Sequence, residues 1–460
     1  MDQTLVFDQE LIRRYDRSGP RYTSYPTAVQ FHEDFRAEHY RAAAERSNAT
    51  GRPLSLYLHL PFCDTVCFYC ACNKVVTKDR ARSRPYLERL YREISLQGEL
   101  FDRSRVVNQL HWGGGTPTFF SNDEMQALME KTRQHFTLHE DDGGEYSIEI
   151  DPREARADTV ALLRRLGFNR MSLGVQDFDP KVQRAVNRIQ TEQETTEVMN
   201  AARAYGFGSV SVDLIYGLPF QQVESFGRTL EKILALQPDR ISIFNYAHLP
   251  DLFMPQRRIN SEDLPSPAEK LAILQHSIES LTAAGYLYIG MDHFAKPSDE
   301  LARAQREGSL YRNFQGYSTH ADADLIGLGA TAISQVDSTY SQNVRDLEPY
   351  YARLDQGDLA LFRGVELNAD DRLRRDVITS LICHFQLDYS KIAHNHGVHC
   401  PDYFSLELAE LAAMENDGLL ALLPTGIQVQ PKGKLLIRNI CMVFDQYLRG
   451  ATQRRFSKVI

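Results

Sequence analysis

Residues 57–74 read Tyr57-Leu-His-Leu-Pro-Phe-Cys63-Asp-Thr-Val-Cys67-Phe-Tyr-Cys70-Ala-Cys72-Asn-Lys74, directly after a short apolar run that is typical of a strand. The first three cysteines have the spacing C-x3-C-x2-C, and a fourth follows two residues later. A [4Fe–4S] cluster normally takes four thiolates. A loop that supplies only three therefore leaves one iron able to bind another ligand.

Other interpretations of these cysteines are weaker. A structural zinc site usually takes two separated pairs of ligands, whereas these residues form one dense group. Disulfides are disfavoured by the odd total of seven cysteines and by a start without a secretory signal. A closed electron-transfer centre, with Cys72 as the fourth ligand, stays open on spacing alone. The isolated Cys383, Cys400 and Cys441 are expected to be small buried hydrophobic residues.

The bulk composition is that of an ordinary soluble globular protein. The chain has 460 residues, of which 43% are hydrophobic and 25% charged, and this length predicts two domains. No apolar run approaches the ~18 residues that are needed to span a bilayer. The net charge of −9, without a basic tract, gives no sign of nucleic-acid binding. Reduced cysteines without a targeting segment predict a cytoplasmic location.

Short β-rich segments alternate with helical ones through the first two-thirds of the chain. The predicted strands are Leu54–His59, Val107–Trp112, Tyr146–Asp151, Arg170–Val175, Ser209–Leu214, Arg240–Asn245 and Tyr286–Met291. Amphipathic helices are predicted between them, for example Tyr86–Phe101 and Ser266–Ala284, and Ser121 to Glu124 has the pattern of a capping box. This alternation indicates an α/β fold with a parallel sheet, open or curled towards a barrel.

Polar or glycine-rich groups gather where these strands end, which is the rim that carries the active site in barrel folds. The rim groups in chain order are the cysteine loop, Gly113-Gly-Gly-Thr116-Pro117, Glu149, Gln176, Asp213 and Asn245-Tyr-Ala247-His248. Glu149 and Asp213 lie in otherwise apolar strands, so each needs a partner. That partner is either a cationic side chain inside the barrel or the hydroxyl or ammonium groups of a ligand.

Both ends of the chain differ from this pattern. After about residue 365 the sequence becomes helical and apolar, with helices predicted at Asp371–Phe385, Tyr403–Asp417 and Lys432–Leu448 and a short strand pair around Leu419–Val429. This predicts a small, mainly helical and winged-helix-like domain, for which fold does not establish function. The first 50 residues are rich in Tyr, Arg, Gly and Pro near residues 15–27, which favours an irregular arm.

These motifs together resemble a known family, the oxygen-independent coproporphyrinogen III oxidases (dehydrogenases) of the radical S-adenosylmethionine (SAM) superfamily. The resemblance covers essentially the full length. It rests on the cysteine loop, Gly113-Gly-Gly-Thr-Pro, Arg170-Met-Ser-Leu-Gly-Val-Gln-Asp-Phe, Asp213-Leu-Ile-Tyr-Gly-Leu-Pro, Phe244 to Pro250, Gly290 to Phe294, Asn313 to Tyr317, Gly19 to Thr27 and Leu435 to Cys441. It implies a partial (βα)6 barrel of radical SAM type at 51–365, with an arm at 1–50 and the helical domain at 366–460.

The resemblance also implies the cofactors and their residues. A [4Fe–4S] cluster is expected on Cys63, Cys67 and Cys70, with one SAM molecule at its open iron and a second beside it. The positions that match the first SAM site are Tyr57, Gly114, Glu149, Ala247 and Ile333, and those that match the second are Tyr69, Gly115, Thr116, Gln176, Arg188 and Asp213. At Tyr69 the family more often has Phe. Cys72 is expected to be a catalytic residue, together with Tyr57, and not a cluster ligand.

The implied reaction is the oxidative decarboxylation of two propionates of a tetrapyrrole to vinyl groups, started by a 5′-deoxyadenosyl radical and giving protoporphyrinogen IX. Arg17 and Arg21 are candidates for binding the substrate carboxylates. We expect a monomer that uses an unidentified electron donor and binds neither membrane nor nucleic acid. The alternatives are a haem-binding chaperone of the same fold, the closed electron carrier, and a radical SAM enzyme with a small substrate. Cys72 and the arm favour the oxidase over the chaperone.

Overall fold

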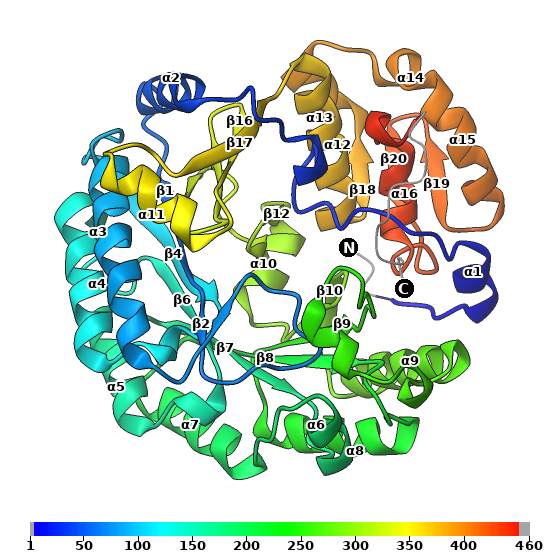
Figure 1. Ribbon diagram of the computed structural model, residues 1–460. Coiled ribbons are helices and arrows are strands. Elements are labelled where there is room, and N and C mark those ends of the chain that lie inside the picture. The colour runs from blue at the N-terminus through cyan, green and yellow to red at the C-terminus, as the bar shows by residue number, and fades with distance from the viewer. Residues whose placement is uncertain (1–3, 450–460) are drawn as a thin grey trace. The chain divides into compact units, whose positions relative to one another are not determined.

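The structure is a computed structural model that describes residues 4–449 (Figure 1). Its described residues form two compact units, each built from segments that are distant in sequence. The barrel unit consists of residues 31–276 and 322–366, and the terminal unit consists of residues 4–30, 277–321 and 367–449. The sequence predicts domain boundaries at residues 50 and 365, in the order of the chain. The two units group segments by their contacts in space, so they do not test these boundaries, which stay a prediction.

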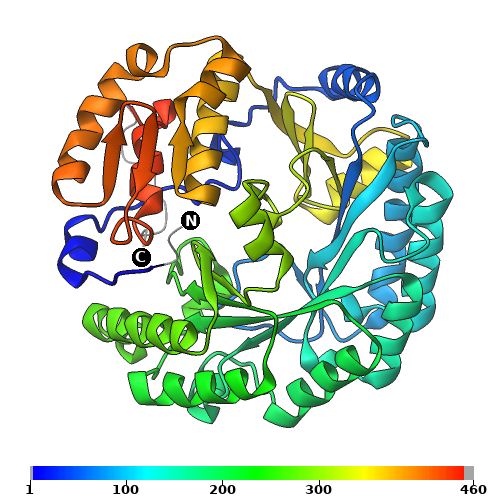
Figure 2. The same cartoon turned by 180° about the vertical axis from the view of Figure 1, so that it is seen from behind.

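The barrel unit contains six parallel strands that neighbour one another in chain order. They are β1 (Leu54–Leu60), β4 (Val106–Gly114), β6 (Glu145–Ile150), β7 (Arg170–Gln176), β8 (Ser209–Tyr216) and β9 (Arg240–Asn245). The connecting helices are α3 (Arg84–Gly98), α4 (Asn122–His135), α5 (Ala157–Leu166), α6 (Pro180–Ala185), α7 (Glu192–Ala204) and α8 (Val223–Leu236), and α9 (Pro267–Ala283) follows β9. Figures 1 and 2 show helices α3, α4, α5, α7 and α8 along the outer side of these strands. The predicted partial (βα)6 barrel is confirmed.

Local sequence explains how these elements begin and end. The Ser121 hydroxyl accepts from the Glu124 N–H at 3.3 Å, and the Glu124 carboxylate accepts from the Ser121 N–H at 2.9 Å, which confirms the predicted capping box of α4. Gly167 ends α5 with a φ of 104°, a conformation that favours glycine. Along β1 and β4 alternate side chains point to opposite faces, so Tyr57 and His111 are register partners on one face.

Four further strands extend the barrel sheet beyond β1, and sequence reasoning missed all of them. They are β14 (Asp324–Leu328), which is parallel to β1, and the antiparallel β15 (Ile333–Val336), β16 (Thr339–Asn343) and β17 (Leu361–Glu366). The short β2 (Phe62–Cys63), β3 (Val75–Val76) and β5 (Thr137–Leu138) and the helices α2 (Ala37–Asn48) and α11 (Leu347–Asp355) complete this unit, apart from short 3₁₀ turns. The missed strands are only four to six residues long, so their period is hard to recognise.

The terminal unit is mixed. It contains α1 (Gln9–Arg14), two hairpins formed by β10 (Leu287–Gly290) with β11 (His293–Ala295) and by β12 (Tyr311–Asn313) with β13 (Gly316–Ser318), and α10 (Glu300–Glu307). The C-terminal part has α12 (Ala369–His384), α13 (Tyr389–His396), α14 (Cys400–Tyr403), α15 (Ser405–Asn416) and α16 (Ile437–Val443) around a sheet of β18 (Gln386–Asp388), β20 (Gly426–Val429) and β19 (Leu420–Leu423). The strand predicted at Tyr286–Met291 is present as β10, where it forms a hairpin with β11.

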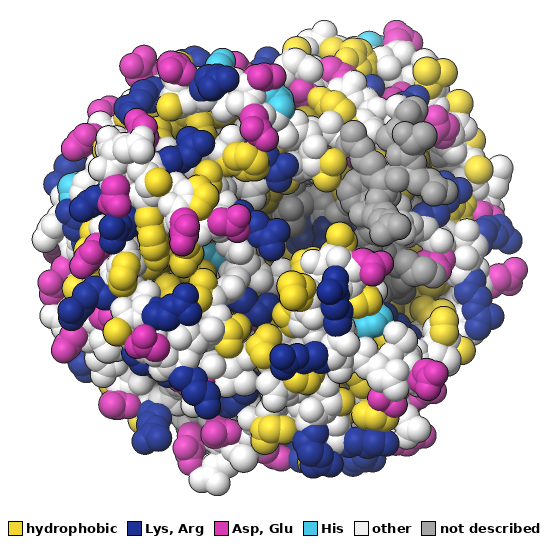
Figure 3. Space-filling model, in the orientation of Figure 1, with side chains coloured by type: hydrophobic (Ala, Val, Ile, Leu, Met, Phe, Trp, Pro, Cys, Tyr) yellow, Lys and Arg dark blue, Asp and Glu magenta, His cyan; other side chains and the backbone are white. Residues whose placement is uncertain are grey.

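Residues 4–30 join the rest of the terminal unit through specific hydrogen bonds. The Arg438 guanidinium donates to the Pro20 carbonyl at 2.9 Å, and the Tyr22 hydroxyl donates to Asp445 at 3.0 Å. The predicted helix Lys432–Leu448 is shorter in the structure, where α16 spans Ile437–Val443. On the face in Figure 3, positive and negative side chains are interspersed. No helix within residues 4–449 is long and apolar enough to cross a membrane.

Candidate active site

The cysteine loop is fixed at both ends by its own strands. β2 and β3 pair in parallel, with Phe62 opposite Val75 and Cys63 opposite Val76. The Val75 N–H donates to the Pro61 carbonyl at 2.7 Å, and the Thr77 N–H donates to the Cys63 carbonyl at 2.9 Å. The loop therefore leaves and returns at one point beyond the end of β1, which holds Cys63 at the barrel rim.

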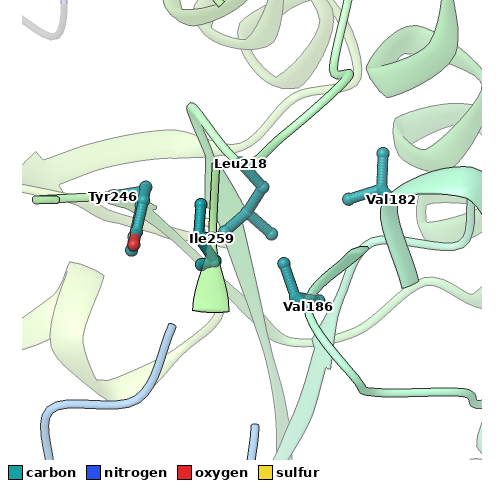
Figure 4. Packing of buried hydrophobic residues seen from close by; sticks show 5 residues of the cluster. All are labelled: Val182, Val186, Leu218, Tyr246 and Ile259. Atoms are coloured by element: carbon teal, nitrogen blue, oxygen red, sulfur yellow. The ribbon is translucent and has the colours of Figure 1, made fainter. Parts of the chain in front are cut away.

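The middle of the loop is held by side chains from two other segments, one after α6 and one in the 3₁₀ turn Met254–Arg258. The Asn187 side chain donates to the Val66 carbonyl at 2.8 Å, and the Gln256 side chain donates to the Tyr69 carbonyl at 2.9 Å. Phe68 and Tyr69 pack on a buried apolar cluster that α6 and the segments after β8 and β9 contribute (Figure 4). Its members are Val182, Val186, Leu218, Tyr246 and Ile259. Full burial of such side chains stabilises the fold by about 1.5–3 kcal/mol each.

The glycine run after β4 is required by close packing against this loop. The Gly115 N–H donates to the Leu60 carbonyl at 2.9 Å, and the Thr116 N–H donates to the Phe62 carbonyl at 2.8 Å. A Cβ atom at Gly115 would lie 2.7 Å from the Phe62 carbonyl oxygen, and one at Gly114 would lie 2.6 Å from the His59 ring. Glycine is thus dictated here by the neighbouring strand and loop.

Glu149 belongs to a polar group on the inner face of β1, β4 and β6. Its carboxylate accepts from the Gly114 N–H at 3.0 Å and lies 3.5 Å from His111 Nε2. Burial opposes ionisation, but these contacts outweigh it and hold the pKa of Glu149 below its ordinary value. The Tyr57 ring stacks on His111, with centroids 5.8 Å apart, and the Tyr57 hydroxyl lies 3.0 Å from His59 Nδ1. The predicted Tyr57 and Glu149 are therefore joined by two histidines that sequence reasoning missed.

Two arginines and one carboxylate surround Cys67. Asp151 Oδ2 accepts from Arg188 Nη1 at 3.0 Å and from Arg153 Nη2 at 2.7 Å. The same two nitrogens lie 3.6 Å and 3.9 Å from Cys67 Sγ. Burial opposes the charge of Asp151, yet the two guanidinium groups lower its pKa. Arg188 was predicted, whereas Asp151 and Arg153 were missed because an Asp-Pro-Arg turn after a strand looks like an ordinary turn.

Gln176 is the last residue of β7, and Asp213 lies within the neighbouring β8. Burial raises the pKa of Asp213 to about 6, although the Ser172 hydroxyl donates to it at 2.9 Å. Gln176 ends β7 with a φ of 70°, and its buried Oε1 atom has no hydrogen-bond partner among residues 4–449. The buried Arg188 Nε has none within that range either. Because buried polar atoms are normally bonded, these two atoms indicate a polar ligand at this rim.

The four loop cysteines differ in their surroundings. Cys63, Cys67 and Cys70 are partly or fully buried, whereas Cys72 is exposed. A hydrogen bond between the neighbouring thiols lowers the pKa of Cys70 and raises that of Cys72. This difference favours Cys70 over Cys72 as a thiolate.

One cavity brings together most of the predicted residues. Its lining includes Cys63, Cys67, Cys70, Cys72, Tyr69, Gly114, Gly115, Thr116, Glu149, Gln176, Arg188 and Asp213, together with Lys74, Asp151 and Arg153. Tyr57, Ala247 and Ile333 are not part of its lining, although Tyr57 lies beside His111 behind Glu149. No three His, Cys, Asp or Glu side chains within residues 4–449 converge on a single ion. The thiols of a four-iron cluster bind different irons, so this donor set fits a cluster and not an ion.

Comparison with known proteins gives consistent results. Residues 57–233 match the model of the radical SAM superfamily, and residues 367–436 match the HemN C-terminal domain. The oxygen-independent coproporphyrinogen III oxidase of Pseudomonas aeruginosa is 56% identical over 460 residues and covers 100% of both chains. That of Escherichia coli is 52% identical over 459 residues and covers 100% of this chain and 99% of its own.

A solved structure agrees with these matches. The coproporphyrinogen III oxidase (HemN) from Escherichia coli, a radical SAM enzyme, superposes with a TM-score of 0.92 at 50% identity and covers 97% of this chain and 100% of its own. The resemblance inferred from the motifs is thereby confirmed, and the haem-chaperone alternative is not favoured. The chain belongs to the family of oxygen-independent coproporphyrinogen III oxidases, which are radical SAM enzymes of haem biosynthesis.

Proposed function

We propose that the chain decarboxylates two propionate side chains of coproporphyrinogen III to vinyl groups at the cavity beside the cysteine loop. In each event one hydrogen atom passes from a propionate to the SAM-derived radical, one electron passes to a separate one-electron acceptor, and carbon dioxide is released. The observation that carries this assignment is the set of three partly or fully buried cysteines that line one cavity with Glu149, Arg188 and Asp213.

Cys63, Cys67 and Cys70 are the residues that would hold a [4Fe–4S] cluster. When bound, the cluster and SAM supply the radical that removes a hydrogen atom from the propionate. The guanidinium groups of Arg153 and Arg188 lie 3.9 Å and 3.6 Å from Cys67 Sγ. Thr116 Oγ1 lies 3.6 Å from Cys63 Sγ and directs its hydroxyl at that sulfur.

The SAM molecules are assigned to the polar groups around this loop. Tyr57, Gly114, Glu149, Ala247 and Ile333 are proposed for the first molecule, and Tyr69, Gly115, Thr116, Gln176, Arg188 and Asp213 for the second. The unbonded Gln176 Oε1 and Arg188 Nε support the second set, since a ligand with a donor and an acceptor satisfies both. The low pKa of Glu149 keeps a negative charge available for an ammonium group.

The substrate assignments made from sequence differ in their support. Arg21 forms an ion pair with Asp292, so its charge is already matched within the terminal unit. Arg17 is exposed and remains a candidate for a substrate carboxylate. Cys72, which is exposed beside Cys70, is proposed as a catalytic residue. We further propose that the enzyme acts in the cytoplasm as a monomer and takes its electron from a separate donor.

The test is anaerobic iron–sulfur reconstitution of the full chain, followed by electron paramagnetic resonance with and without SAM and by product analysis. We expect the signal of the reduced cluster to change on addition of SAM, and vinyl products to form from coproporphyrinogen III. Cys67→Ser should lose the cluster, while Cys72→Ser should keep it and lose activity. A cluster signal that SAM leaves unchanged, together with cluster loss in Cys72→Ser, contradicts the proposal and supports a closed electron carrier.

A further inference from the structure

The hairpin of β12 and β13 carries a buried arginine whose charge is not matched. Arg312 is only 6% exposed, and its Nε and Nη1 atoms have no hydrogen-bond partner within residues 4–449. No carboxylate in that range forms an ion pair with it. A buried guanidinium loses its hydration, which is unfavourable unless an anion or hydrogen-bond acceptors replace the water.

The Tyr317 ring and Cys383 lie near Arg312. The guanidinium lies 4.8 Å from the centre of the Tyr317 ring, and the Tyr317 hydroxyl donates to the Ile382 carbonyl at 3.1 Å. Burial raises the pKa of the nearby Cys383 to about 12, so this thiol is neutral at physiological pH. A contact with an aromatic face offsets part of the cost of a buried cation but provides no hydrogen-bond acceptor. The protein surroundings thus leave the positive charge without an anion.

A second donor on the same hairpin has the same deficiency. The side-chain nitrogen of Gln315 is buried, and no described residue accepts a hydrogen bond from it. Gln315 lies in the motif Asn313 to Tyr317, which the cofactor assignments do not use and which Arg312 directly precedes. Two unbonded donors on one short hairpin, one of them charged, indicate that an anionic oxygen ligand completes this place.

We propose that Arg312 binds a carboxylate of the substrate. This inference rests on the proposed function, which supplies a ligand with four carboxylates. It assigns substrate recognition to the terminal unit, whereas the residues proposed for the cluster and SAM belong to the barrel unit. An Arg–carboxylate pair satisfies both the charge and the hydrogen bonds of the guanidinium. It also explains why an uncompensated cation is retained in a protein interior.

The test uses the reconstituted full-length enzyme and the stable oxidised probe coproporphyrin III, whose binding is followed by fluorescence. We expect Arg312→Met to weaken binding of this tetracarboxylate at least tenfold and Arg312→Lys to weaken it less. The tetramethyl ester of the probe should bind equally weakly to wild type and to Arg312→Met. Arg303→Met, which removes an exposed arginine from the neighbouring α10, is the control and should bind the probe like wild type.

Two further measurements decide between ligand binding and structure. The thermal midpoint of Arg312→Met without ligand should equal or exceed that of wild type, because an uncompensated buried charge is removed. SAM affinity should not change. Unchanged coproporphyrin affinity in Arg312→Met overturns the inference. If the variant loses affinity for SAM and not for coproporphyrin, the site belongs to the SAM carboxylate. Lower midpoints and lost probe binding in both the Met and Lys variants would assign Arg312 to the fold.

Further measurements distinguish a failure of the Arg312 carboxylate site from a failure of the proposed decarboxylation. Reduction of the Arg312→Met enzyme with dithionite should cleave SAM at the wild-type rate, since the cofactor residues are untouched. If wild type binds the porphyrin through Arg312 but forms no vinyl product, the decarboxylation proposal fails and the carboxylate site stands. If wild type forms vinyl product and Arg312→Met binds and converts the substrate equally well, only the carboxylate site fails.

Discussion

Two buried arginines, one in each unit, differ in the hydrogen-bond and ion-pair partners of their guanidinium groups. Arg105 in the barrel unit pairs with Asp324, donates to the Arg52 carbonyl at 2.6 Å and donates to the Asn48 side chain at 2.9 Å. Arg312 in the terminal unit lies beside the Tyr317 ring, and its Nε and Nη1 atoms have no hydrogen-bond partner within residues 4–449. Burial alone therefore does not reveal the role of a charge. A charge whose partners are all within the protein maintains the fold, whereas one without them needs a ligand.

The same difference separates the groups at the cysteine loop. Asp151 has its charge matched by Arg153 and Arg188, but Gln176 Oε1 and Arg188 Nε are left unbonded within the described part of the chain. Some groups at the rim thus have all their partners within the protein, whereas others have buried polar atoms that a ligand would satisfy. We therefore expect substitutions of the first kind of group to lower stability and substitutions of the second kind to lower ligand affinity. The following experiments test this expectation.

The largest effect is expected at the thiols, where a single atom decides whether the cofactor is retained. Cys67→Ser should lose nearly all cluster iron and all SAM cleavage, because a hydroxyl is a poor replacement for a thiolate ligand. Arg312→Met should keep both and lose only porphyrin affinity. Iron and sulfide analysis with electron paramagnetic resonance measures the difference. Retention of a full cluster in Cys67→Ser would remove the basis for assigning ligands from the loop spacing.

The second experiment compares the two arginines directly. Arg105→Met leaves the buried carboxylate of Asp324 unpaired, which typically destabilises a protein by about 3–5 kcal/mol. Arg312→Met leaves no such charge behind, so it should be neutral or stabilising. The free energy of unfolding in urea, measured for both variants and for Arg303→Met, tests this opposite sign. Equal losses at positions 105 and 312 would contradict the assignment of Arg312 to a ligand.

Much of the barrel and its rim could be predicted from the sequence. Strand 240–245 was predicted with its observed bounds, and β1, β4, β6, β7 and β8 to within two residues, because buried parallel strands are continuous apolar runs. The cysteine, glycine and Glu149 positions were found because each follows or lies in such a strand. That these residues share one cavity follows from the parallel topology alone.

What sequence reasoning missed depends on contacts between distant segments. His59 and His111 were missed as members of the Glu149 group, although His59 lies two residues after Tyr57 and so shares its strand face. Arg153 and Asp151 become recognisable only when Arg188, more than thirty residues later, is placed beside them. The unmatched charge of Arg312 has no sequence signature, because a missing partner is a property of the packed structure.

A third experiment concerns the apolar support of the loop. Leu218 is fully buried in the cluster on which Tyr69 packs (Figure 4). Leu218→Ala should destabilise the protein by about 2–4 kcal/mol through the cavity it creates. If this apolar packing holds the cysteine loop in place, the variant should also lose its iron–sulfur cluster more rapidly in air than wild type. Leu406→Ala, at a leucine that is 67% exposed, is the control and should change neither property.

The smallest effect is a change in the pH dependence of stability at Asp213. Its pKa is raised to about 6 by burial, so between about pH 4 and 6 the native protein holds a proton that the unfolded chain has released. Its stabilising contribution is full below about pH 4 and is lost as the pH rises through 6. Asn cannot ionise, so the urea midpoint of Asp213→Asn should rise relative to wild type over this range and then level off.

Asp388, in the terminal unit, provides the opposite case. It caps α13, where the hydrogen bond from the Ser390 hydroxyl lowers its pKa. The stability it contributes is present above the ordinary Asp pKa and is lost as the pH falls, so Asp388→Asn should approach wild type at low pH. If the urea midpoints of the two variants, relative to wild type, change with pH in opposite directions, ionisation of Asp213 destabilises the fold. This is expected for a carboxylate whose hydrogen-bond partners come from a bound ligand. Parallel slopes would show that Asp213 already has its full set of partners within the barrel.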